Sequence, residues 1–94
     1  MKIIKQIMPV PESIRLAWYQ NKEGDLVNYT KPLGMALVES GKDTSISFFD
    51  EVDKEVNLID ENDPDYLGSV DRGNPEDVAR TEEVALQIFK LRNK

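Results

Sequence analysis

Apolar and polar residues alternate along the first half of the chain. Within residues 13–20, one face of an extended segment would hold three apolar residues: Ile14, Leu16 and Trp18. A period of two is typical of a half-buried β-strand, so we predict a strand here. Trp18 is expected in the core, because large aromatic side chains dominate the burial of a small domain. Tyr19 falls on the opposite face, which we expect to be the more exposed one.

Turn residues separate this strand from several others. A turn cluster precedes an alternating run at residues 26–31, which predicts a hairpin with Tyr29 on the same outer face as Tyr19. A second hairpin is predicted from the runs at residues 35–39 and 44–49, because another turn cluster lies between them.

Two further segments of the first sixty residues are less regular. Residues 1–8 predict a first or edge strand that Pro9 and Pro11 end, since proline cannot donate to a ladder. Residues 50–55 and 56–59 are ambiguous, because their apolar residues also have helical spacing. We expect a loop or hairpin turn at 50–55 and a short strand at 56–59, since several acids in succession disfavour a short helix.

The C-terminal segment predicts a helix over residues 75–92. Asn74 is a good N-cap, Pro75 suits the first helical position, and the two acids that follow stabilise the positive end of the helix dipole. Three cations suit the other end: Lys90, Arg92 and Lys94.

The apolar residues of this helix form two stripes. The first stripe holds four residues: Val78, Ala85, Leu86 and Phe89. The second holds Val84, Ile88 and Leu91, which makes the apolar arc wider than a helix on one sheet face needs. A helix seated deeply in a small core explains both stripes. The alternative is a homo-oligomer or partner contact through the second stripe.

Together these elements predict an α+β fold: a small antiparallel sheet, or partly closed barrel, of four to six short strands with one C-terminal helix. The 94 residues are expected to form a single domain, because a chain of this size buries too little surface for two independent cores. An apolar fraction of 39% with 32% charged residues is ordinary for a globular protein, so wholesale disorder is not expected.

Acidic residues are concentrated between Asp50 and Asp77. That segment has eleven carboxylates against two cations, a charge of −9, whereas the whole chain carries −6. Residues 60–74 are interpreted as an acidic loop, and long loops in compact domains tend to be functional or disordered. Six residues are the candidates for contact with a protein partner that has a basic surface: Asp60, Asp63, Asp65, Tyr66, Tyr19 and Tyr29. The competing interpretation is that the acids only keep the loop solvated.

The acidic loop also has part of the spacing of a calcium-binding loop. Asp63, Asp65 and Asp71 fall at ligand positions of a twelve-residue EF-hand-like segment. Leu67 stands where a ligand oxygen is needed, and Asn74 stands where a bidentate Glu is needed, so a true EF-hand is not expected. A weak divalent-cation site at these three aspartates is the minor alternative.

Chemistry that needs cysteine or histidine is excluded, because the chain has neither residue. This removes disulfides, thiolate nucleophiles, the commonest general base and most transition-metal sites. The five glycines are isolated and form no phosphate-binding motif. The cations are scattered and balanced by acids, so direct nucleic-acid binding is not expected. We expect no cofactor and no enzymatic activity.

The sequence therefore predicts a small acidic, non-enzymatic protein-binding or regulatory module. The main alternative is an inhibitor of the DNA-mimic type, whose carboxylates would occupy the basic groove of a nucleic-acid-binding protein. Residues 1–11 include Lys2 and Lys5 and no apolar run long enough for a membrane span or a signal-peptide core. The resulting expectations are no membrane association and a cytoplasmic location.

Overall fold

The computed structural model describes residues 2–22, 24–52 and 55–93, and it describes only the backbone of residues 51, 52, 55 and 56. Two compact units share the chain. Unit 1 comprises Met1–Glu12 and Pro32–Asp60, and unit 2 comprises Ser13–Lys31 and Glu61–Lys94. Each unit is thus assembled from two separate segments, and the expectation of one domain over residues 1–94 stays a prediction.

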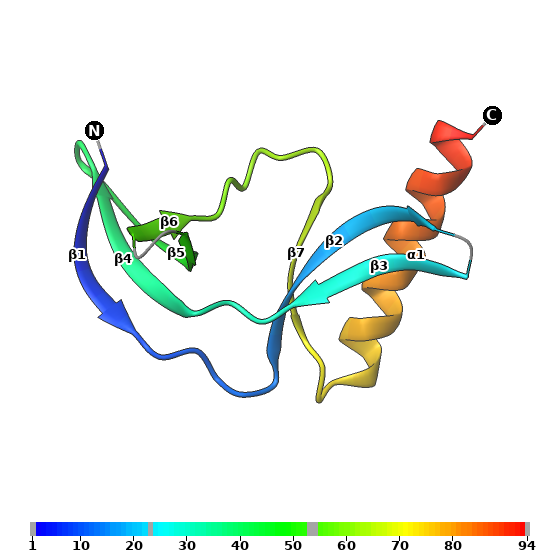
Figure 1. Ribbon diagram of the computed structural model, residues 1–94, viewed down its shortest axis with the longest axis horizontal. Coiled ribbons are helices and arrows are strands. Elements are labelled where there is room, and N and C mark those ends of the chain that lie inside the picture. Colours follow the sequence, from blue (N-terminus) through cyan, green and yellow to red (C-terminus); the bar gives the residue numbers. More distant parts are fainter. Residues whose placement is uncertain (1, 23, 53–54, 94) are drawn as a thin grey trace. The chain divides into compact units, whose positions relative to one another are not determined.

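Unit 1 is an antiparallel sheet with the strand order β1-β4-β5-β6 (Figure 1). Its strands are β1 (Lys2–Met8), β4 (Gly34–Ser40), β5 (Asp43–Val52) and β6 (Glu55–Leu58). Alternate residues of β4 and β5 meet in a small core of Ala36, Val38 and Phe49, against which Leu58 packs. Gly34 lies opposite Phe49, and a Cβ there would come 2.6 Å from the ring atom Cζ, so the close packing of this ring requires glycine.

Unit 2 combines an antiparallel sheet with the C-terminal helix. The strands are β2 (Ile14–Lys22), β3 (Asp25–Thr30) and β7 (Tyr66–Asp71), in the order β3-β2-β7. The helix α1 (Pro75–Arg92) lies against one face of these strands (Figure 1). The core between them holds five buried residues: Ala17, Tyr19, Val27, Val70 and Ala85.

Helix α1 covers the range that the sequence predicts. The side chain of Asn74 accepts a hydrogen bond from the backbone N–H of Glu76, Pro75 occupies the first turn, and the acids and cations stand at the ends where the helix dipole favours them. At the other end, the backbone N–H and the side-chain amide of Asn93 both donate to the carbonyl of Phe89. These local interactions explain why both boundaries are readable from sequence.

The predicted fold class is confirmed. The chain is α+β, with antiparallel sheets and one C-terminal helix, and the described residues contain seven strands in two sheets where four to six were expected. The sequence predicts a loop or hairpin turn over residues 50–55, but Asp50–Val52 belong to β5 and Glu55 begins β6. Asp53 and Lys54, in the expected turn, lie outside the described residues.

Three sequence expectations differ from the structure. Residues 60–74 are not a continuous loop, because Tyr66–Asp71 form β7 and pair with β2. Tyr19 is not exposed but only 8% accessible, because α1 packs on the face of β2 that carries Ala17 and Tyr19. Trp18, expected in the core, is half-buried on the other face. The period of two placed these residues on opposite faces, but it could not indicate which face the helix would cover.

The two apolar stripes of α1 are only partly used in unit 2. Val78, Ile88 and Phe89 pack against the core, and Ala85 is fully buried. Val84, Leu86 and Leu91 remain exposed, with Leu91 67% accessible. The predicted second stripe is therefore divided, because Ile88 contributes to the core while its neighbours in the stripe do not.

Candidate functional site

The six candidate partner-binding residues are distributed over both units. Asp60 belongs to unit 1, whereas Asp63, Asp65, Tyr66, Tyr19 and Tyr29 belong to unit 2. The acidic segment between Asp50 and Asp77 is divided in the same way, with a charge of −4 in its unit 1 part and −5 in its unit 2 part. Each unit is therefore acidic in its own right over this segment.

Asp65 and Tyr19 are brought together by Arg92. The backbone N–H of Tyr19 donates to the carbonyl of Asp65 over 2.7 Å, and Arg92 Nη1 lies 2.8 Å from Asp65 Oδ1. The same guanidinium lies over the ring of Tyr19, 4.8 Å from its centroid. Asp65 thus serves to fix the last turn of α1 to the segment before β7.

The other two aspartates of the expected cation site bind backbone groups. Asp63 Oδ1 accepts the N–H of Asp65 at 2.9 Å, and Asp71 Oδ1 accepts the N–H of Gly73 at 2.9 Å, so both side chains stabilise local turns. Among the residues that the structure describes, no three carboxylates converge as a metal site would require. The weak divalent-cation site therefore gains no geometric support.

Tyr66 packs beside Trp18 on the face of the unit 2 sheet opposite α1. Their ring centroids are 4.9 Å apart with an interplanar angle of 46°, and Trp18 Nε1 donates to Thr30 Oγ1 over 3.0 Å. Burial, with a smaller contribution from the charge of Glu61, raises the pKa of the Tyr66 hydroxyl above its usual value. Tyr66 therefore packs onto β2, although part of its side chain stays accessible.

A second contact between an arginine and a tyrosine ring involves Tyr29. The guanidinium carbon of Arg72 lies 4.1 Å from the ring centroid, and the hydroxyl group donates to Glu82 Oε1 over 3.4 Å. Burial and the nearby Glu82 raise the pKa of Tyr29, and Arg72 opposes that rise. This contact joins the middle of α1 to β3.

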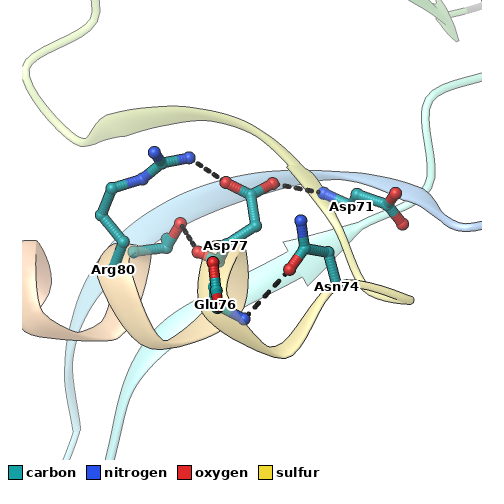
Figure 2. A network of polar contacts seen from close by, with 6 residues as sticks. Asp71, Asn74, Glu76, Asp77 and Arg80 are labelled. Carbon is teal, nitrogen blue, oxygen red and sulfur yellow. Dashed lines mark hydrogen bonds and ion pairs between the residues drawn. The ribbon is translucent and has the colours of Figure 1, made fainter.

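The start of α1 is fixed by a polar network that Figure 2 shows from close by. Asp77 Oδ2 accepts the backbone N–H of Asp71 over 2.8 Å, and Asp77 Oδ1 pairs with Arg80. The hydrogen bond from Asp71, aided by Arg80, lowers the pKa of Asp77 below its usual value. Asp77 of the acidic segment thus has a structural role at the start of α1.

A groove lies between the β2–β3 hairpin and α1. Two adjoining hollows of about 280 Å³ and 360 Å³ share Leu26 and Leu86. We name this feature the hairpin–helix groove, and six residues define it: Leu26, Leu86 and Phe89 with Lys22, Asp25 and Glu82. Leu86 is 42% accessible, so the groove presents an apolar surface beside exposed carboxylates.

This groove is missing from the sequence expectations. Its two walls come from residues about sixty positions apart, and no local periodicity relates Leu26 to Leu86. The one feature of the sequence that could have indicated the groove is the excess of apolar residues on the helix. Ligand sites typically are concave, mostly apolar and bounded by a few polar groups, and they begin at roughly 300 Å³. The groove combines apolar and charged residues in this way, and its two hollows lie just below and just above that lower size.

Comparisons of this chain with models of protein families, with curated proteins and with solved structures find no match. Among the described residues, no helix has the combination of length and apolar character that crossing a membrane requires.

Proposed function

We propose that this protein is a small, non-enzymatic protein-binding module whose partner presents a basic surface. The observation that carries the proposal is the hairpin–helix groove, where exposed Leu86 lies beside Asp25 and Glu82. An apolar centre with a polar rim is the usual organisation of a protein interface. The partner would place an apolar side chain on Leu26 and Leu86 and a lysine or arginine beside the carboxylates.

The charge of the chain supports the sign of the partner. The net charge is −6, and acids outnumber cations in both units. Such a field favours encounter with a basic surface and weakens with salt, since exposed charges are screened over about 10 Å at 0.1 M ionic strength. Lys22 is the exception in the groove and would favour a partner residue of opposite charge at that end.

The DNA-mimic alternative has less support. A mimic needs a row of carboxylates available to a basic groove, whereas Asp65 and Asp77 are paired with arginines and Asp63 binds a backbone N–H. No contact among the described residues favours the DNA-mimic function over partner binding at the hairpin–helix groove.

The decisive experiment is affinity capture from cells of the source organism with variants that change only the groove. Leu86→Lys places a cation in the groove, and Leu91→Lys is the matched control, because it adds the same charge to the same helix at an exposed position outside the groove. A third bait changes Asp60, Asp63 and Asp65 to Asn. We expect a basic protein to be retained by the native chain and the Leu91 variant and lost from the Leu86 variant.

The outcomes separate the alternatives. Loss of a nucleic-acid-handling protein from the triple Asn bait alone would favour the mimic. Equal retention by the two lysine variants would show that the groove is not the contact, and the proposal would then be wrong.

A further inference from the structure

Strand β3 forms an open edge of the unit 2 sheet along the hairpin–helix groove. The strand order is β3-β2-β7, and within the part of the chain that the structure describes no strand pairs with β3 on its other side. In an antiparallel ladder, alternate residues of an edge strand direct their N–H and C=O groups away from the paired neighbour. Residues of this same strand, Asp25 to Val27, line the groove.

From Val27 to Thr30, the edge of β3 lacks the devices that normally block strand addition. Lysines, prolines and β-bulges are the usual protections of an edge. The six residues of β3 include neither lysine nor proline, and their pairing with β2 is regular from Val27 to Thr30, with a register shift toward the hairpin end, opposite Asp25 to Val27. Strand β1 in unit 1 differs, since it has Lys2 and Lys5 and a register shift between Ile4 and Gln6.

The opposite edge of the unit 2 sheet is also protected. Strand β7 pairs with β2 through a register shift between Ala17 and Trp18, and Gly68 near that shift has a φ of 109°. A glycine in this conformation bends the strand and interrupts a flat edge. The ladders on both sides of β2 thus have a register shift, and what singles out β3 is the hairpin–helix groove beside it.

We propose that the partner binds as an extended segment that adds a strand to the free edge of β3. This inference rests on the proposed function, because it describes how the groove is occupied. Alternate side chains of the added strand would point toward α1, where Leu26, Leu86 and Phe89 receive an apolar residue. A lysine or arginine of the same segment would lie beside Glu82 or Asp25. Main-chain hydrogen bonds supply affinity, and the groove supplies selectivity for basic segments that alternate in polarity.

The test uses the full chain and synthetic peptides long enough to span β3. The first probe alternates lysine with valine and has one central phenylalanine. The second has the same composition, with its apolar residues spaced three and four apart for a helix. Two further forms of the first probe have N-methyl groups on the backbone amides of either the odd or the even residues. Binding is measured by titration, and backbone amide hydrogen exchange is followed along β3.

We expect the alternating peptide to bind more tightly than its isomer and to slow exchange at alternate amides of β3 by more than about tenfold. One N-methylated form should lose more than about tenfold in affinity and the other little, because only one set of amides faces β3. Glu82→Gln should weaken binding by about two- to fivefold, whereas Glu83→Gln, the matched change at the next residue, which is also exposed, should have a smaller effect.

Two results would overturn strand addition and leave the proposed function standing. The first is equal binding of both peptides, sensitive to Leu86→Lys, without slower exchange in β3. The second is no binding of either peptide while a basic protein is still captured in a Leu86-dependent way. Absence of both peptide binding and Leu86-dependent capture would overturn the two proposals together.

Discussion

The guanidinium of Arg92 lies 2.8 Å from the carboxylate of Asp65, and the two side chains join the last turn of α1 to the segment that leads into β7. Arg92 also covers the ring of Tyr19, which is buried under the helix. Arg92 thus contacts both Asp65 and Tyr19, two of the residues that the sequence analysis predicted for partner binding. The acidic segment is therefore in part a means of holding the helix in place, and its charge cannot all be available to a partner.

Arg92→Ala should lower the free energy of unfolding of the chain by about 1 kcal/mol. The ion pair is roughly half exposed and contributes about 0–1 kcal/mol, and the contact with the Tyr19 ring adds a similar amount. Urea unfolding followed by the fluorescence of Trp18, the single tryptophan and a residue of unit 2, would measure the loss. Arg92→Lys should be intermediate, because lysine keeps the charge without the planar stacking.

The control for this variant is Lys90→Ala, which removes the same charge from the same turn. Its smaller effect would show that the Arg92 contacts matter beyond the helix dipole. Equal losses for the two alanine variants would contradict the role assigned to Arg92. At about 1 M salt the difference between native chain and Arg92→Ala should shrink, because screening then acts over about 3 Å.

The sequence predicted best where structure depends on neighbours in the chain. The start of α1 was predicted correctly, because Asn74, Pro75 and the acids behind them act within one helical turn. Most strands were predicted for the same reason, since alternation is visible in a short window. The burial of Tyr19 was not, because it depends on α1, whose residues are more than fifty positions away.

The site was predicted less well than the fold. The sequence showed where carboxylates are abundant but not which of them pair with cations. Asp65 pairs with an arginine 27 residues away along the chain, and Asp77 with one three residues away. The hairpin–helix groove depends on the pairing of distant walls and had no local signature. The composition therefore indicated a negative electrostatic field, whereas the candidate contact surface could be located only in the structure.

Asn74→Ala should destabilise unit 2 by about 1 kcal/mol, the usual cost of losing an N-cap. The side-chain oxygen Oδ1 accepts the N–H of Glu76 at 3.1 Å, and alanine offers no acceptor to replace it. Asn74→Ser retains an oxygen and should stay close to the native value. The loss would be measured by denaturant unfolding, and an alanine variant as stable as the serine variant would argue against the cap.

Tyr66 should contribute to a loss of stability in alkali. Its pKa in the folded chain is raised by burial and by Glu61, so the unfolded chain ionises first, near pH 10. The stability due to the neutral hydroxyl is complete below that pH and is lost as the pH rises through the folded-state pKa. Tyr66→Phe should therefore flatten the decline in stability above about pH 10 while changing little at pH 7. Glu61→Gln should lower the pKa of Tyr66, which a titration of tyrosinate absorbance can follow.

Asp77 should contribute to a loss of stability in acid. The backbone N–H of Asp71 and the side chain of Arg80 stabilise its ionised form, so its pKa in the folded chain lies below that in the unfolded chain. Its contribution is complete above about pH 4 and is lost as the pH falls through the folded-state pKa. Asp77→Asn should therefore be less stable than the native chain at pH 7, and the two stability curves should converge in acid. Thermal unfolding between neutral pH and about pH 3 would follow the convergence.

The matched control for Asp77→Asn is Glu76→Gln, which removes one negative charge from the same first turn of α1 at an exposed position. The backbone N–H of Glu76 donates to Asn74, whereas its side-chain charge acts mainly on the helix dipole and is screened by salt. The Asp77 variant should consequently show the larger loss at pH 7 and the larger change in pH dependence. Parallel curves for native chain and Asp77→Asn at all pH values would mean that the hydrogen bond from Asp71 does not depend on the charge of this carboxylate.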